Sequence, residues 1–126
     1  MSHFTTVAVQ ITNIEDLKTC LKEMGYIILD VKVVRGYGNS KQVVDLAIKP
    51  TADSYPIGFR KLPTGEFEVV ADWWGVHSIK EKEFMGKLKS TFAEEKISKF
   101  AQRNRYTVKR STVNQETVLE LVRRTY

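Results

Sequence analysis

Hydrophobic residues in this chain follow two different spacings, and the order in which the spacings alternate restricts the fold more than any other feature of the sequence. Over His3–Ile11 hydrophobic and polar residues alternate, as in a strand with one buried face. From Ile14 to Met24 they recur every three or four positions, as in an amphipathic helix. Asn13 and Gly25 suit the N-terminal and C-terminal ends of that helix. The buried face of the strand is expected to carry Val7, Val9 and Ile11.

Four more alternating stretches follow before the spacing changes again. They are Tyr26–Arg35, Gln42–Lys49, Ile57–Leu62 and Glu66–Trp73. Turn-forming residues separate them at Gly36–Ser40 and Pro63–Gly65. We expect the buried faces to be Ile27, Leu29, Val31 and Val33 in the first, Val44, Leu46 and Ile48 in the second, and Phe67, Val69, Ala71 and Trp73 in the last.

A long helical stretch runs from about Ile79 to Asn104, with Ser78 and Glu81 as a predicted capping box. Its hydrophobic residues form two stripes, Phe84, Leu88 and Phe92 in one and Ala93, Ile97, Phe100 and Ala101 in the other. Because successive helical residues turn by about 100°, the stripes lie on different sides. Either the helix breaks near Ser90–Thr91 or it buries a wide face against two elements. We expect the break.

Two alternating stretches close the chain, Tyr106–Val113 and Thr117–Tyr126, as a hairpin across Asn114–Glu116. The predicted order of elements is therefore β-α-β-β-β-β-α-β-β. Consecutive hairpins favour an antiparallel sheet with the helices packed on one face, so the predicted fold class is α+β. The β-α-β start allows one parallel pair through a right-handed crossover. At 126 residues the chain is expected to be a single domain, residues 1–126.

The sequence lacks the marks of several protein classes. A lone cysteine, Cys20, excludes an internal disulfide framework. No run of about 18 apolar residues could cross a membrane, and the first residues do not form a secretory signal. His3, His77 and Cys20 do not stand at the spacing of zinc or iron–sulfur ligands. No metal and no cofactor is predicted.

Few residues suggest catalysis. Cys20 lies beside a helical apolar stripe, where a free thiol usually packs as a small hydrophobic group. His77 could be a general base or a surface residue. Gly36–Gly38 lacks the third glycine of a dinucleotide-binding loop and joins two strands. The sequence therefore favours binding over catalysis and indicates no catalytic residue.

Asp72–His77 is the least ordinary stretch of the chain. Trp73 and Trp74 are adjacent at a strand end, so their indoles point to opposite sides. One ring belongs to the core. The other is either covered by the long helix or part of a contact surface for a protein or a flat ligand. His77 follows directly and is included in this candidate surface.

Positive charge gathers in the second part of the chain. Residues 1–76 carry 8 Lys/Arg and 9 Asp/Glu, whereas residues 77–126 carry 12 and 6. Basic and aromatic residues cluster around the closing hairpin, namely Arg103, Arg105, Tyr106, Lys109, Arg110, Arg123, Arg124 and Tyr126. Such a cluster can bind single-stranded nucleic acid by stacking and charge, but it is also typical of a solvated helix face and a Lys-rich edge strand.

Three stretches together resemble the hypothetical chloroplast open reading frame 35 family, which is encoded in cyanobacteria and algal plastids. They are Met1–Thr5, Ile57–Arg60 and Ala71–Val76, and the Ala-Asp-Trp-Trp-Gly run is the most specific. The resemblance covers essentially the whole chain. It departs before the closing hairpin, where members tend to have glycine and this chain has Asn104–Arg105. It implies a protein of the plastid stroma or the cyanobacterial cytoplasm, with no known reaction, cofactor or catalytic residue.

These observations predict a small non-catalytic factor of a photosynthetic cell that binds an unknown protein partner. The Trp73/Trp74 junction is the expected centre of its binding surface, with the basic hairpin at the rim. The alternative is an anion-binding module that takes RNA, DNA or a phosphorylated ligand on the basic hairpin. A small enzyme that uses His77 is a third interpretation.

Overall fold

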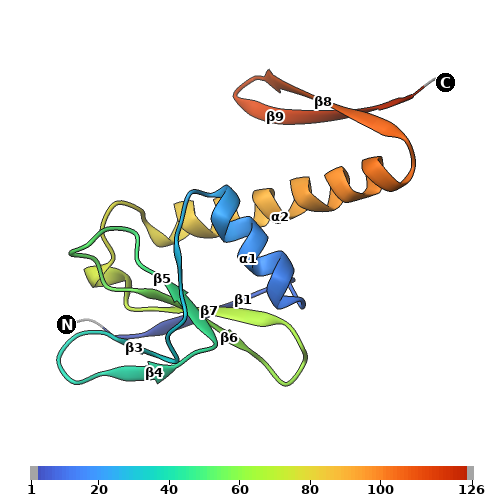
Figure 1. Ribbon diagram of the computed structural model, residues 1–126. Helices are drawn as coiled ribbons and strands as arrows, with labels where there is room; N and C mark the ends of the chain where they lie inside the picture. Colours follow the sequence, from blue (N-terminus) through green and yellow to red (C-terminus); the bar gives the residue numbers. More distant parts are fainter. Residues whose placement is uncertain (1–2, 125–126) are drawn as a thin grey trace.

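The computed structural model describes residues 3–124 and has the predicted α+β architecture, with helices on one face of an antiparallel sheet (Figure 1). The structure has the predicted order of helices and strands. Met1 and Ser2 of the family resemblance, and Tyr126 of the basic cluster, lie outside the described residues. The main sheet has the strand order β1 (Thr5–Val9), β7 (Phe67–Ala71), β6 (Ile57–Lys61), β5 (Leu46–Ile48) and β2 (Ile28–Leu29).

The helix α1 (Ile14–Glu23) forms where the capping residues predict it. The Asn13 side chain accepts hydrogen bonds from the backbone N–H groups of Glu15 and Asp16, at 2.7 and 3.4 Å. Gly25 adopts a φ of 91°, which few other residues tolerate, and so ends the helix. Its apolar stripe is buried at Leu17, Cys20 and Leu21.

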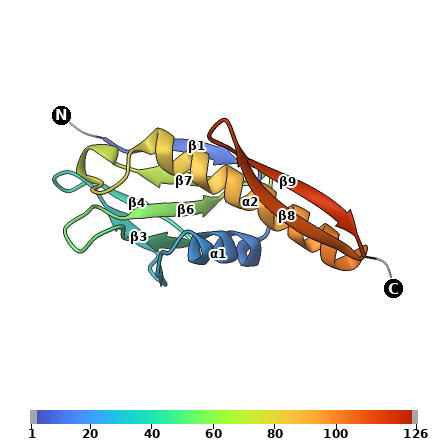
Figure 2. The same ribbon diagram turned by 90° about the horizontal axis from the view of Figure 1, so that it is seen from above.

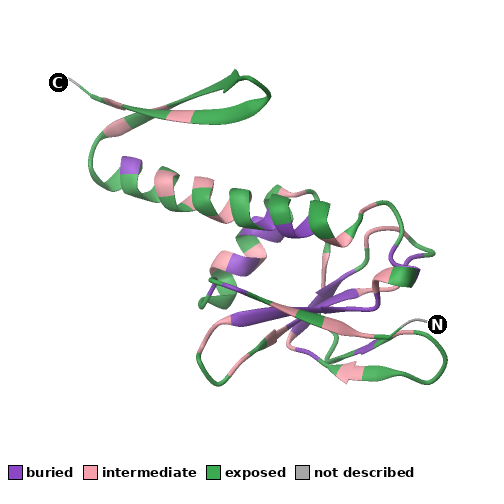
Figure 3. Cartoon of the chain, turned by 180° about the vertical axis from the view of Figure 1, so that it is seen from behind, coloured by how far each residue is buried: buried purple, intermediate pink, exposed green. Residues whose placement is uncertain are grey.

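Each face of the main sheet is covered by a different layer. On one face, α1 and the first half of α2 (Glu81–Arg103) enclose the larger core, as the purple segments of Figure 3 show. This core includes the predicted strand faces of β1 and β7. On the other face lies a small two-stranded sheet of β3 (Val33–Arg35) and β4 (Lys41–Val43). A Cβ on Gly58 would stand 2.5 Å from a methyl carbon of Val44, so glycine permits this close approach.

Two of the predicted strands are each divided into two short strands. Tyr26–Arg35 becomes β2 and β3, and Gln42–Lys49 becomes β4 and β5. The cause is that both segments pass from the main sheet to the small sheet: β2 pairs with β5, whereas β3 pairs with β4. One long hairpin is therefore bent across the edge of the main sheet.

This bend also corrects the predicted buried faces. Ile27 is 82% exposed, and Ile28 packs against the larger core instead, because Ile28 pairs with the buried Ile48. Val44 belongs to the smaller core between the sheets, together with Val34, whereas Leu46 and Ile48 face the helices. A strand that changes sheets cannot keep one continuous face.

The first strand and the strand after α1 do not form the parallel pair that the sequence allows. The strands β1 and β2 occupy opposite edges of the main sheet, and every ladder between the described strands is antiparallel. The hairpin partners β5, β6 and β7 lie between the two edges.

The long helix α2 is continuous, so the expected break near Ser90–Thr91 is wrong. Of the two alternatives, the wide face is correct: Phe84 and Leu88 are buried against the sheet, whereas Phe100 stacks on Tyr106 of the closing hairpin. The helix starts later than predicted, since the Glu83 carboxylate accepts from the Lys80 N–H at 3.3 Å. The capping box of Ser78 and Glu81 therefore does not form.

The closing hairpin of β8 (Tyr106–Val113) and β9 (Glu116–Arg123) stands outside the sheet core. It turns at Asn114 and Gln115, whose φ values of 51° and 65° are typical of a two-residue turn that matches strand twist. Figures 1 and 2 show it running back along the second half of α2, away from the main sheet. Each strand has eight residues, and none of them is buried.

Candidate functional site

The two tryptophans lie on a short 3₁₀ turn, η1 (Trp73–Gly75), between β7 and α2. The Trp73 ring packs against Phe84 of α2 with ring centroids 5.9 Å apart, so it belongs to the edge of the larger core. Trp74, by contrast, points away from the core and is 68% exposed. Indoles of this size are rarely left in water, which marks Trp74 as a candidate contact residue.

Two tyrosines frame the exposed indole. Tyr37 meets the Trp74 ring edge-on, with centroids 5.7 Å apart, and Tyr55 lies at 6.2 Å. We refer to Tyr37, Tyr55 and Trp74 as the aromatic corner. Sequence reasoning did not include either tyrosine, because they stand in loops far from Trp74 in the chain. Their one signal is an aromatic residue inside each of two polar turn segments.

The backbone beneath the aromatic corner is closely fixed. Asp72 is buried, and its carboxylate accepts a hydrogen bond from the Tyr37 N–H at 3.1 Å. The Tyr55 N–H donates to the Gly75 carbonyl at 2.8 Å. The Tyr55 ring lies over Gly75, where a Cβ would come within 2.2 Å of it. The run Asp72–Gly75 thus connects both tyrosine loops to the tryptophans, which explains why these residue types occur together.

His77 lies next to the aromatic corner and pairs with an acidic residue. The Nδ1 atom of its ring is 3.1 Å from the Asp53 carboxylate, and its backbone N–H donates to the Ser54 hydroxyl at 2.9 Å. Hydrogen bonds from Thr51 and then from His77 lower the pKa of Asp53. The Ser54 hydroxyl itself donates to the carbonyl of Tyr55. These contacts give the His77 ring an orienting carboxylate and fix its backbone to the loop that carries Tyr55.

The basic residues gather around the closing hairpin but divide between its two faces. Tyr106 stacks on Phe100, and Arg110 donates to Glu94 at 2.6 Å, so their face lies toward α2. By the strand register this face also carries Arg123, whereas Lys109 projects from the opposite face. Arg103, Arg105 and Arg124 are exposed around the junction of α2 with the hairpin.

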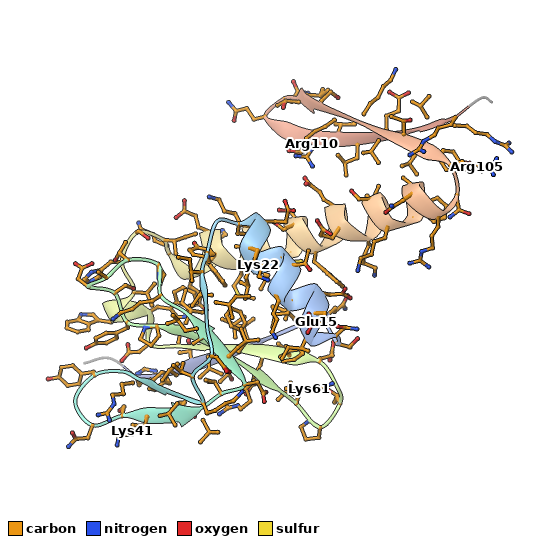
Figure 4. The ribbon with its side chains drawn as sticks, viewed as in Figure 1. Glu15, Lys22, Lys41, Lys61, Arg105 and Arg110 are labelled. Carbon is orange, nitrogen blue, oxygen red and sulfur yellow. The ribbon has the colours of Figure 1, made fainter. Side chains whose placement is uncertain are left out.

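The structure does not bring the two parts of the predicted surface together. In Figures 1 and 2 the turn η1 lies at the end of the main sheet where α2 begins, whereas the hairpin is attached at the far end of α2. Arg105 and Arg110 are labelled at the hairpin in Figure 4. The basic cluster is therefore not the rim of the Trp73/Trp74 junction. A continuous 23-residue helix separates them.

Cys20 lies on α1, is buried in the larger core and carries an unreactive thiol. Burial raises the pKa of its thiol to about 11, with further contributions from Glu95 and Asp16. Only the thiolate is a good nucleophile, so the protonated thiol acts as a small hydrophobic residue. Among residues 3–124, no group of three or more His, Cys, Asp or Glu could hold a metal ion.

Two shallow grooves flank α2. One of about 490 Å³ lies between α2 and the edge strand β1, with Leu88 and Phe92 among its lining residues. The other, of about 440 Å³, lies between α1 and α2, where Lys99 donates to Asp16 at 2.6 Å. The second groove carries charges of both signs, including Glu95, which makes it a poor site for a free anion.

The comparisons with known proteins place the chain in a family. A family model for proteins of unknown function, DUF1257, matches residues 20–122. The chain belongs to the DUF1257 family. The matched part of this DUF1257 protein includes both the aromatic corner and most of the closing hairpin. No curated protein and no solved structure matches the chain. Across the described residues of the DUF1257 chain, neither helix has the length and apolar character to cross a membrane.

Proposed function

We propose that this DUF1257 protein is a non-catalytic accessory factor that binds another protein through the aromatic corner. The observation that carries the proposal is the Trp74 indole, which is largely exposed yet held by two tyrosine rings. Tryptophan and tyrosine are enriched among the residues that dominate interface energies. A complementary partner has an apolar pocket for the indole and a polar group that faces His77 and Asp53.

Preorganisation supports this function. The rings of the aromatic corner come from three segments that are tied together by the buried Asp72 and by the contact between Tyr55 and Gly75. A side chain that is already ordered loses little conformational entropy on binding. The corner therefore offers affinity from a small area, as expected for an accessory factor that recognises one partner.

The cellular setting is part of the same proposal. The resemblance of Ala71–Val76 and the other two stretches to a plastid and cyanobacterial family supports a role in the plastid stroma or the cyanobacterial cytoplasm. We also propose that residues 1–126 form one domain, because α2 contributes both to the larger core and to the hairpin contact.

The basic hairpin supports the anion-binding alternative less well. A stacking platform for nucleic acid needs aromatic and basic side chains on one open face. Here Tyr106 stacks on Phe100, Arg110 pairs with Glu94, and Lys109 lies on the other face. The geometry thus favours protein binding at the aromatic corner.

The experiment compares Trp74→Ala with Ile27→Ala as bait in native photosynthetic extracts, each divided into a nuclease-treated and an untreated half. Both side chains are exposed and apolar, at 68% and 82%, but Ile27 lies away from the aromatic corner, in the segment that leads into β2. We expect Trp74→Ala to lose at least about tenfold of the partner that the unchanged chain captures, and Ile27→Ala to retain it. Circular dichroism should show both variants folded. Equal capture by both variants, or capture that depends on nucleic acid, would contradict the proposal.

A further inference from the structure

The closing hairpin has far less support than the rest of the fold. A two-stranded hairpin is at best marginally stable alone in water. Here its contacts with α2 include the stacked rings of Phe100 and Tyr106 and the ion pair of Arg110 with Glu94. Apolar side chains stay open to solvent, with Val113 52%, Val118 41% and Leu121 38% exposed. An ordered hairpin of two eight-residue strands with so little cover needs a further packing partner.

The strand register shows which backbone groups are open. The N–H of Arg124 donates to the carbonyl of Arg105, and this ladder pairs Tyr106 with Arg123 and so on to the turn. Hydrogen-bonded and non-hydrogen-bonded pairs alternate along an antiparallel ladder. The backbone N–H and C=O groups that point out from β9, away from β8, are therefore those of Thr117, Leu119, Leu121 and Arg123. The two-stranded sheet leaves both of its outer edges open.

We propose that a second copy of this chain pairs with the open edge of β9, antiparallel and about a two-fold axis, to form a four-stranded sheet. In the register with Glu120 on the axis, Leu119 lies opposite Leu121 of the second copy, and Val118 lies opposite Val122. These are the apolar residues of β9, and each meets another apolar residue. Cross-strand pairs of this kind stabilise sheets.

The charges at the axis of this register are partly balanced. Within the hairpin Lys109 pairs with Glu120. Across the dimer the row then has a lysine, two glutamates and a lysine, because each Lys109 flanks one of the central carboxylates. The two central carboxylates repel each other, and the Lys109 that flanks each of them offsets part of that repulsion.

The edge of β8 is unsuitable for a second copy. The strand contains Lys109 and Arg110 and no acidic residue. Antiparallel pairing with itself near full overlap places Lys109 against Lys109 or Arg110 against Arg110. Like charges directly opposite each other destabilise a sheet, and basic residues are a common protection of edge strands. In neither register does an apolar residue of β8 meet another apolar residue, whereas all four apolar residues of β9 do. This difference selects β9 as the open edge and a second copy as its occupant.

This dimer leaves the aromatic corner free. A two-fold axis perpendicular to the sheet places both α2 helices on the same face of the four-stranded sheet, where they cover its inward residues. The turn η1 lies at the other end of α2 (Figure 1). Self-association and partner binding therefore use separate surfaces, and failure of one proposal does not imply failure of the other.

A pair of proline variants tests the proposal. Thr112 and Thr117 lie directly opposite each other, and both N–H groups point outward, from β8 and from β9 respectively. Proline removes the donor and obstructs an added strand. The two variants should perturb the hairpin itself equally. Sedimentation equilibrium of the purified chain should give twice the 14.5 kDa monomer mass. Thr117→Pro should weaken the dimer by at least about tenfold, since backbone hydrogen bonds are lost in both copies, and Thr112→Pro should not.

Cysteine substitution tests the register independently of hairpin stability. Residues 118 and 122 would face each other across the two copies in a non-hydrogen-bonded pair, whose Cα separation suits a disulfide. Within one strand they are too far apart to react. Val118→Cys with Val122→Cys should give a covalent dimer on oxidation, whereas Val113→Cys should not, and Cys20 is buried and cannot interfere.

Each contrary outcome overturns the proposal. A chain that is monomeric at all concentrations would exclude a second copy as the occupant of the edge. Equal weakening by both proline variants, or loss of the dimer in Thr112→Pro alone, would exclude β9 as the paired edge. A dimer that forms without the 118–122 crosslink would exclude this register.

Discussion

The hairpins β6–β7 and β8–β9 are both antiparallel strand pairs joined by a short turn, but they differ in how far their residues are buried. Every residue of β7 is buried, whereas no residue of β8 or β9 is. The sequence of β7 is apolar at most positions on both faces, and helices cover one face while β3 and β4 cover the other. In β9 the apolar residues Val118, Leu119, Leu121 and Val122 are divided between both faces and flanked by charged residues, which suits partial cover. One hairpin is therefore completed within the chain, whereas the other has open edges that can take an added strand.

The largest expected effect is at the centre of the completed region. Phe84 is fully buried and its ring contacts those of Tyr26, Phe59 and Trp73. Phe84→Ala should lower the free energy of unfolding by about 3 to 5 kcal/mol. Val118→Ala in β9, measured at a concentration where the chain is monomeric, should lower the free energy of unfolding by less than about 0.5 kcal/mol. Urea denaturation measures both, and similar costs would contradict the contrast between the two regions.

The next effect depends on pH and tests whether the Cys20 thiol is buried away from water. Because the pKa of Cys20 is raised from 9.0 to about 11 by burial, the folded state disfavours the thiolate. Stability is unaffected below pH 9 and falls as the pH rises from 9 to 11, by up to about 2 to 3 kcal/mol. Unfolding of Cys20→Ala serves as the control, since this variant should lack that part of the decline. Identical pH profiles for the two chains would show that the thiol is not buried as described.

A smaller pair of effects should have opposite signs. The Cβ of Gly75→Ala would collide with the Tyr55 ring, so this change should destabilise the fold by about 1 to 3 kcal/mol and displace the aromatic corner. Gly86 lies inside α2, and a Cβ added there would meet no atom within 4 Å apart from the adjacent backbone of its own helix. Gly86→Ala should therefore stabilise the helix by up to about 1 kcal/mol. Thermal unfolding distinguishes them, and two changes of the same sign would contradict the described packing at Gly75.

Local signals predicted the parts of the fold that depend on neighbouring residues. Asn13 and Gly25 set the ends of α1, and the turn predicted across Asn114–Glu116 is present but shorter, at Asn114–Gln115, with Glu116 already paired in β9. The bend that divides Tyr26–Arg35 has no local signal, because it results from pairing with two different sheets. The continuity of α2 could not be predicted either, because its second hydrophobic stripe packs against a hairpin that comes later in the chain.

The candidate site was predictable only in part. The adjacent Trp73 and Trp74 indicated one inward and one outward ring, and the structure has this arrangement. Tyr37 and Tyr55 could not be assigned to the site, because they reach Trp74 through tertiary packing that no spacing in the sequence records. The separation of the basic hairpin from the tryptophans likewise depends on α2 being straight and unbroken.

Amide hydrogen exchange on β9 tests most directly whether the second hairpin is completed by another copy. The outward amides of Thr117, Leu119, Leu121 and Arg123 should be protected in concentrated samples and lose that protection on dilution, because exchange reports local opening. The outward amides of β8, such as those of Val108 and Thr112, should exchange rapidly at both concentrations. Rapid exchange of the β9 amides at every concentration would contradict the account.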